Sequence, residues 1–194
     1  MRKAKMKRTT KETDISIEFN LDGKGFANID SGIGFFDHML TLFTVHGDFD
    51  LSLRCKGDVQ VDSHHSVEDI GILLGKCIKE ALGDRKGIQR YASVTIPLDE
   101  SLCSATIDVS GRPYMAYNAE RLSHAFSSDF DFQLVEEFMR ALAINGGLTL
   151  HINLHYGSNY HHMAEAIFKS VARALKQAVQ IVSDKIPSSK GTLD

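Results

Sequence analysis

The sequence lacks the features that mark secreted, membrane and nucleic-acid-binding proteins. It has no tryptophan and only three cysteines in 194 residues, without a CxxC pair, which argues against a disulfide framework or zinc ribbon. No apolar run approaches the ~20 residues of a membrane span, and no apolar stretch follows the basic residues 1–8 to make a secretory signal. A net charge of −3 gives little attraction to nucleic acid. We therefore expect a cytoplasmic protein without membrane or nucleic-acid partners.

Linkers and low-complexity tracts are also missing, so residues 1–194 are expected to form one unit. Within it, two halves read alike, about 8–88 and 89–186. Each has an alternating strand, a helical segment that stops at Gly47 or Gly146, a second alternating segment and a final helix. The pattern predicts an α+β fold of internally duplicated β-β-α-β-β-α halves, with two sheets and the helices packed between them.

The motif HHxxE occurs twice, at residues 64–68 and 161–165, and each copy opens a stretch with helical apolar spacing. The copies lie 97 residues apart (161 − 64), half the length of the chain. Positions i and i+4 share a helix face, so each copy presents imidazoles and a carboxylate together. One copy alone could equally be a solvated helix start, with its Glu near the positive end of the helix dipole. Two copies at a half-chain period favour two related metal sites.

The repeat places two further residues in equivalent positions. His38 lies nine residues before Gly47, and Glu137 lies nine residues before Gly146. Each could therefore supply one more ligand to its own site. Glu137 could also belong to a solvated helix face, because Glu136 is beside it.

Several longer strings resemble the imidazoleglycerol-phosphate dehydratases of histidine biosynthesis. They cover nearly the whole chain: residues 34–40 (GFFDHML), 62–69 (DSHHSVED), 97–100 (PLDE), 108–114 (DVSGRPY), 157–166 (GSNYHHMAEA) and 187–191 (PSSKG). The resemblance implies a ribosomal S5 domain 2-like fold and a hydro-lyase that converts D-erythro-1-(imidazol-4-yl)glycerol 3-phosphate to 3-(imidazol-4-yl)-2-oxopropyl phosphate. It also implies two Mn2+ per subunit and a homo-oligomer, an octahedral assembly of trimers with active sites between subunits.

The resemblance also assigns residues to the two metals. One metal would take His64, Glu68 and His161, and the other would take His38, His65, His162 and Glu165. Many family members have a histidine at the position of Glu137, so its role as a ligand stays open, and Leu42 replaces a frequent glutamine that would contact a substrate hydroxyl. The candidates for binding the substrate phosphate are Arg90, Arg112, Lys169, Ser188 and Lys190, although a single surface lysine could also be a solvated cation.

The implied chemistry runs through a metal-bound imidazolate of the substrate, because the departing hydroxyl has no neighbouring carbonyl to accept electrons. Glu165, Asp99 and Glu12 are the candidates for acid–base catalysis. Glu165 could instead be only a ligand, and Asp99 could only orient a histidine. Two other functions remain open from the residues alone: a dinuclear metallohydrolase that releases free phosphate, and a metal-storage shell without catalysis. Ligands of the His/Glu type also accept zinc, iron or cobalt, so they do not identify the metal.

Overall fold

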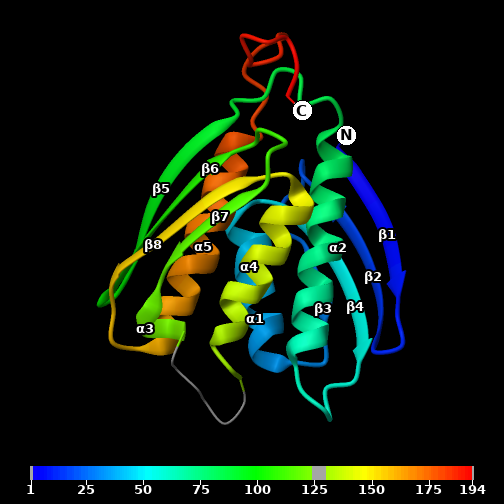
Figure 1. The fold of residues 1–194 in the computed structure, drawn as a ribbon, viewed down its shortest axis with the longest axis vertical. Helices are drawn as coiled ribbons and strands as arrows, with labels where there is room; N and C mark the ends of the chain where they lie inside the picture. Colours follow the sequence, from blue (N-terminus) through cyan, green and yellow to red (C-terminus); the bar gives the residue numbers. More distant parts are fainter. Residues whose placement is uncertain (1, 124–129, 194) are drawn as a thin grey trace.

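Two four-stranded sheets enclose a layer of helices in the structure, a computed structural model that describes residues 2–123 and 130–193 (Figure 1). The first half contains β1 (Lys3–Thr9), β2 (Thr13–Asn20), β3 (Ala27–Asp30), α1 (Gly34–His46), β4 (Asp50–Gly57) and α2 (His64–Leu82). The second half contains β5 (Tyr91–Leu98), β6 (Ser101–Asp108), β7 (Tyr114–Asn118), α3 (Glu120–Ser123), α4 (Gln133–Gly146), β8 (Thr149–Tyr156) and α5 (Tyr160–Ala178). The predicted α+β class, the duplication and the helices between two sheets are confirmed.

The order of elements within each half differs from the predicted β-β-α-β-β-α. Three strands precede the first long helix, and one strand separates it from the HHxxE helix. The sheet orders are β1-β2-β4-β3 and β5-β6-β8-β7, with β3 parallel to β4 and β7 parallel to β8. A parallel pair needs a crossover connection, which α1 and α4 supply. The short edge strands β3 and β7 have too few residues for a clear alternating pattern.

The helices α1 and α4 end at equivalent positions in the two halves, as the sequence repeat predicts. After α1 the backbone turns through Asp48 (φ 47°), and after α4 it turns through Gly147 (φ 66°). This left-handed conformation is typical of helix ends. In each half the left-handed residue follows the glycine that was expected to end the helix by one position. Gly146 is therefore the last residue of α4 and not the residue after it. The spacing from Asp48 to Gly147 equals the spacing from His38 to Glu137, which keeps these two residues equivalent.

The helices pair across the two halves. α2 packs on α4, and α1 packs on α5. Glycines permit the closest approach: a Cβ on Gly75 of α2 would lie 2.7 Å from the carbonyl oxygen of Leu142 and 2.9 Å from the backbone nitrogen of Gly146. Gly71, one turn earlier, meets α4 at similarly short distances. In the part of the chain that the structure describes, no helix is long and apolar enough to cross a membrane.

We predict that Gly75→Ala destabilises the fold. Alanine favours a helix by about 1 kcal/mol over glycine, but here its methyl group would press on backbone atoms of α4, and overpacking of this kind costs roughly 1–3 kcal/mol. Denaturant unfolding measures the difference. Gly34→Ala is the control, because a Cβ at Gly34 on α1 meets nothing within 4 Å. Equal stability of the Gly75→Ala and wild-type proteins would show that the two helices can separate without cost.

Candidate active site

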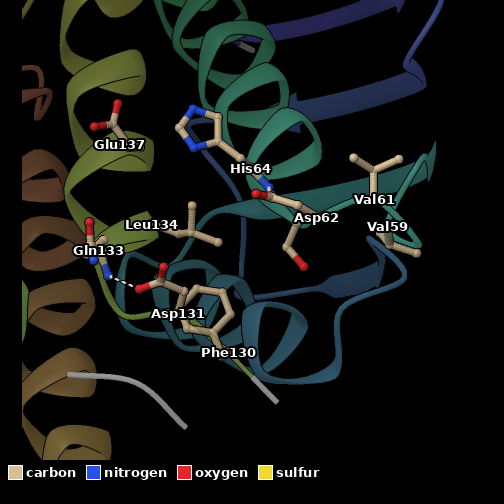
Figure 2. Close-up of a pocket in the computed structure, with 10 residues that line it drawn as sticks. Val59, Val61, Asp62, His64, Phe130, Asp131, Gln133, Leu134 and Glu137 are labelled. Atoms are coloured by element: carbon tan, nitrogen blue, oxygen red, sulfur yellow. Dashed lines mark hydrogen bonds between the residues drawn. The ribbon is translucent and has the colours of Figure 1, made fainter. Parts of the chain in front are cut away.

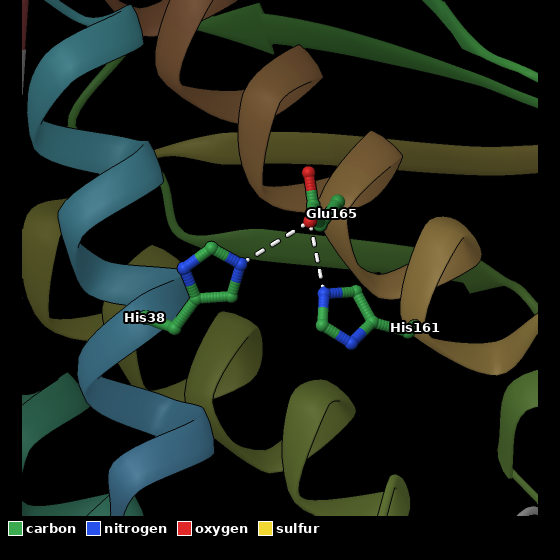
Figure 3. A group of neighbouring side chains, drawn as sticks. All are labelled: His38, His161 and Glu165. Atoms are coloured by element: carbon green, nitrogen blue, oxygen red, sulfur yellow. Dashed lines mark hydrogen bonds and ion pairs between the residues drawn. The ribbon is translucent and has the colours of Figure 1, made fainter.

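Two histidines and a carboxylate converge where α1 meets α5 (Figure 3). Oε1 of Glu165 lies 3.2 Å from Nε2 of His38 and 2.9 Å from Nε2 of His161. His161 and Glu165 are four residues apart on α5, while His38 comes from α1 of the other half. Within residues 2–123 and 130–193, this is the one group of three possible ligands whose donor atoms all lie within 4.8 Å of one another.

Glu165 is the centre of this group and is strongly favoured in its ionised form. Burial by itself would raise the pKa of Glu165, but hydrogen bonds from Lys169 and His38 outweigh it and lower the pKa to about 2. Lys169 binds the second carboxylate oxygen, Oε2, which leaves Oε1 directed at the two histidines. The carboxylate therefore presents one charged oxygen toward His38 and His161, an arrangement that could hold a metal ion.

A pocket opens beside these histidines. Its volume is about 840 Å³, and besides His38 and His161 its walls include the aromatic side chains of Phe35, Phe132 and Tyr160. The ring of Phe35 meets the ring of His161 edge-on, with the centroids 5.3 Å apart. Flat aromatic walls beside two imidazole side chains suit a small planar ligand.

The corresponding place in the other pair of helices holds His64, Glu68 and Glu137. Nε2 of His64 lies 3.9 Å from Oε2 of Glu68 on α2. His64 and Glu137 line one pocket of about 580 Å³, where Figure 2 shows them on facing helices. These residues occupy the positions equivalent to the first trio, with Glu137 of α4 where His38 stands on α1, but their donor atoms are not grouped as closely among the described residues. Glu137 thus faces the candidate site, as its equivalence to His38 predicts.

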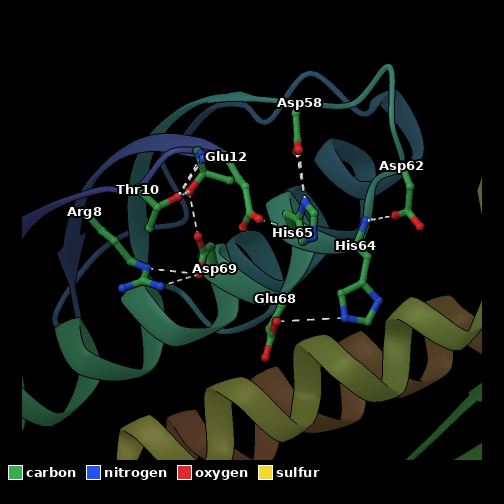
Figure 4. Close-up of polar contacts among 10 residues, drawn as sticks. Arg8, Thr10, Glu12, Asp58, Asp62, His64, His65, Glu68 and Asp69 are labelled. Atoms are coloured by element: carbon green, nitrogen blue, oxygen red, sulfur yellow. Dashed lines mark hydrogen bonds and ion pairs between the residues drawn. The ribbon is translucent and has the colours of Figure 1, made fainter.

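The second histidine of each motif is held through Nδ1 by a carboxylate. Nδ1 of His65 lies 3.1 Å from Asp58 (Figure 4), and Nδ1 of His162 lies 2.8 Å from Glu100. Hydrogen bonds from these histidines to the carboxylates stabilise the protonated rings and raise the pKa of both histidines. A ligand histidine normally binds a carboxylate or carbonyl through its other nitrogen, which fixes the ring and increases its basicity. Nε2 of each ring is therefore the nitrogen available to a metal.

Two of these residues were not found from the sequence. We expected Asp99 to be the carboxylate that could orient a histidine, but Asp99 is 4.0 Å from Nδ1 of His162, whereas Glu100 is 2.8 Å away. Glu100 also accepts the backbone N–H groups of Ser158 and Asn159, so it holds the start of α5 as well. Its place beside Asp99 in the string PLDE was the available signal. Asp58 lies in a loop without a recognisable pattern.

The grouping of ligands within one chain differs from the one that the resemblance implies. His161 lies with His38 and Glu165, while His64 and Glu68 lie together without it. His65 contacts Asp58, and its Nε2 is 3.9 Å from Glu12. All of these contacts are formed within one chain.

Two arginines, Arg85 of the first half and Arg90 of the second, hold the C-terminal tail against the body of the protein. Arg90 donates to both carboxylate oxygens of Asp108 at 2.8 and 3.3 Å and to the carbonyl oxygen of Pro187 at 2.7 Å. Its hydrogen bonds with Asp108 also raise the pKa of Arg90. Arg85, which is buried, donates to the carbonyl oxygen of Leu193. Arg90 was predicted to bind phosphate; within one chain its charge is matched by Asp108 and it fixes the tail.

The other predicted phosphate ligands are divided between two ends of the molecule. Arg112 and Lys190 are exposed, and Ser188 is half-buried. Ser188 and Lys190 belong to the C-terminal tail, which lies near the C-terminal end of α5 (Figure 1). Lys169, in contrast, is paired with Glu165. The tail and the HHxxE motifs are separated by the length of α5, 19 residues, or about 28 Å at 1.5 Å per residue. One chain therefore does not bring the tail to the histidines.

Comparison with known proteins identifies the family. The family model described as imidazoleglycerol-phosphate dehydratase matches residues 31–175. The chain belongs to this family. An imidazoleglycerol-phosphate dehydratase of Syntrophus aciditrophicus (strain SB) is 53% identical over 195 residues, covering 100% of this chain and 99% of the relative. That of Clostridioides difficile (strain 630) is 55% identical over 193 residues, with all of both chains covered.

A solved structure gives the same result at the level of the fold. The crystal structure of imidazoleglycerol-phosphate dehydratase from Staphylococcus aureus subsp. aureus N315 superposes with a TM-score of 0.84 at 42% identity, covering 93% of this chain and 99% of that one. Family membership confirms the predicted activity as a hydro-lyase, the dehydratase step of histidine biosynthesis. The individual metal, catalytic and phosphate ligands stay predictions.

We predict that Glu100→Gln weakens metal binding. Glutamine keeps an oxygen for the N–H groups of Ser158 and Asn159, but it removes the charge beside His162, and loss of such a partner typically lowers metal affinity by about 10- to 100-fold. Metal titration should be done near pH 8, well above the ordinary histidine pKa of about 6.5, to reduce competition by protons in both proteins. A lower pH would mix two effects, because the raised pKa of His162 lets protons compete with metal in the wild type.

Glu18→Gln is the matched control, since Glu18 is an exposed glutamate paired with Lys5 on the outer face of the first sheet. It should bind metal as the wild type does. Unchanged affinity in Glu100→Gln would mean that His162 is not a ligand oriented by Glu100.

Proposed function

We propose that this chain dehydrates D-erythro-1-(imidazol-4-yl)glycerol 3-phosphate to 3-(imidazol-4-yl)-2-oxopropyl phosphate with the help of bound metal, two Mn2+ per subunit. The convergence of His38, His161 and Glu165 carries the metal part of the proposal. Two imidazole nitrogens and one ionised carboxylate oxygen fit a divalent first-row metal. The equivalent residues His64, Glu68 and Glu137 would hold the second ion, and His65 and His162 would add ligands through Nε2. Metal on the substrate's ring nitrogens would favour the deprotonated ring, which can release electrons toward the departing hydroxyl.

The protein's own carboxylates divide into those that hold ions and those that can move protons. Glu165 is engaged by two histidines and Lys169, which supports a ligand role. Glu12 has a half-exposed carboxylate 3.9 Å from Nε2 of His65, and it accepts no hydrogen bond from the residues that the structure describes. We assign Glu12 the proton transfer at the substrate's side-chain carbons. Asp99 is more exposed, at 76%, and remains the alternative.

We also propose that the active site is completed between subunits of a homo-oligomer, built from trimers in an octahedral assembly. The separation of the tail from the histidines supports this, because a substrate of this size cannot bridge about 28 Å. A neighbouring subunit could bring its Arg112, Ser188 and Lys190 to the phosphate of a substrate held at the first subunit's histidines. The exposed positions of Arg112 and Lys190 suit such a contact.

We place the enzyme in the cytoplasm. The proposal is supported by a role in amino-acid biosynthesis and by its cysteines, since Cys55, Cys77 and Cys103 are free thiols. Burial raises the pKa of Cys77 to about 12 and that of Cys103 to about 11. Both thiols are therefore protonated and inert at neutral pH.

The function is tested by the products of the purified enzyme. Protein stripped with a chelator should be inactive, and Mn2+ should restore formation of the ketone without release of phosphate. His161→Ala should lower both metal content and kcat, because it removes a nitrogen from the trio. Release of free phosphate would instead indicate a metallohydrolase, and full activity of metal-free protein would contradict metal dependence.

A mixing experiment tests the shared active site. His161→Ala removes a histidine at one end of the molecule, and Lys190→Ala removes a proposed phosphate ligand at the other end, beyond the C-terminus of α5. Each variant alone should be weak in catalysis. Dissociating the two together and reassembling them with Mn2+ should restore part of the activity, since some sites then combine an intact His161 with a neighbour's intact Lys190. Activity no higher than the mean of the two variants would place each whole site within one subunit.

A further inference from the structure

Asp69, a buried carboxylate on α2, forms hydrogen bonds with both strands of the β1–β2 hairpin (Figure 4). Its Oδ1 accepts two N–H bonds from Arg8, at 3.0 and 2.8 Å, and its Oδ2 accepts the hydroxyl of Thr13 at 2.6 Å. Arg8 is near the end of β1, and Thr13 is the first residue of β2. Asp69 therefore fastens the hairpin to the HHxxE helix on each side of the turn that carries Glu12.

The turn itself is fixed by a hydroxyl. Oγ1 of Thr10 accepts the backbone N–H groups of Glu12 at 3.1 Å and Thr13 at 3.0 Å, and it lies 3.2 Å from the hydroxyl of Thr13. The hydroxyl of Thr13, which Asp69 accepts, is thus in contact with the hydroxyl of Thr10, which bonds the backbone of the turn. This gives a continuous path of hydrogen bonds from Asp69 through Thr13 and Thr10 to the backbone of Glu12.

The same turn is connected to His65. The carbonyl oxygen of Glu12 accepts the N–H of Asp58 at 3.1 Å, and the side chain of Asp58 holds Nδ1 of His65. Glu12 and His65 are therefore placed relative to each other by backbone and side-chain bonds. The carboxylate of Glu12 itself remains 52% exposed and can reach a ligand.

The other half of the chain shows that the fold does not require such a carboxylate. The residue after the second HHxxE is Ala166, at the position that corresponds to Asp69. There the turn between β5 and β6 is secured differently, by Glu100 bonding the backbone before α5. The helix carboxylate is present only where the hairpin turn carries Glu12.

We propose that Asp69 is a positioning residue that sets the carboxylate of Glu12 for proton transfer, a role that rests on the proposed function of Glu12. Misplacing a catalytic group by about 1 Å can cost roughly 100-fold in rate. Asp69→Asn keeps the size of the side chain but loses the charge that holds Arg8, so the turn is free to shift. The loss should appear in kcat, with little change in KM or metal content.

A double-mutant cycle separates positioning from general stability. Glu12→Gln should lower kcat by about 10²- to 10⁴-fold, and Asp69→Asn should lower it by about 10- to 100-fold. In the double variant, Asp69→Asn should cause no further loss, because the group that it positions is already gone. Multiplying losses would overturn the positioning role. No loss of kcat in Glu12→Gln would overturn the role of Glu12 and, with it, that of Asp69.

Two further variants keep the result interpretable. Thr13→Val removes only one of the bonds to Asp69, so it should lower kcat in the same direction with a smaller effect, even if Asp69→Asn folds poorly. Asp14→Asn is the matched control: Asp14 is on the same hairpin but pairs with Thr9 and Lys7 on the outer face, away from Asp69. It should leave kcat unchanged. Metal loss in Asp69→Asn or Thr13→Val would mean that Asp69 acts through Glu68, its neighbour in sequence, and would contradict the proposal.

Discussion

The close packing of helices from opposite halves is the constraint on which the candidate site depends. α2 can lie against α4 because Gly71 and Gly75 leave no side chain between them. This contact, together with the packing of α1 on α5, fixes the distance between residues that are about 70 to 130 positions apart in the sequence. His38 reaches Glu165 and Glu137 faces His64 for this reason. The sheets outside the helix layer hold the pairs in place and supply the hairpin turns that carry Glu12 and Glu100.

Much of this arrangement could be predicted because it repeats. Two HHxxE motifs, the helices that follow them and the equivalence of His38 with Glu137 all depend on periodicity, and the structure places each pair in corresponding positions. The order of strands could not be predicted as easily. The segments β3 and β7 are short, and only their pairing with β4 and β8 makes them recognisable as strands. The stop of α4 was misplaced by one residue, since two successive glycines each permit the turn.

The carboxylates around the histidines show where sequence reasoning ends. Asp99 and Glu100 are adjacent, and either could reach a neighbouring ring from a turn. The choice depends on the direction of the backbone, which is left-handed at Asp99 (φ 46°) and turns Glu100 toward α5. Asp58 could not be predicted, because only the conformation of the loop between β4 and α2 brings it next to His65. Arg90 was predicted to bind the substrate phosphate, which stays a prediction; its bonds to Asp108 and to the tail could not be predicted, because they depend on the three-dimensional fold.

The crossed pairing of helices has a consequence for the origin of the protein. A polypeptide with only one half would carry an HHxxE motif and a first-helix ligand, yet it could not bring them together within itself. Two copies related by a twofold axis could do so, each lending its first helix to the motif of the other. Fusion of such a pair into one gene would make the two sites independent, so that one could keep an imidazole at His38 while the other acquired the carboxylate of Glu137.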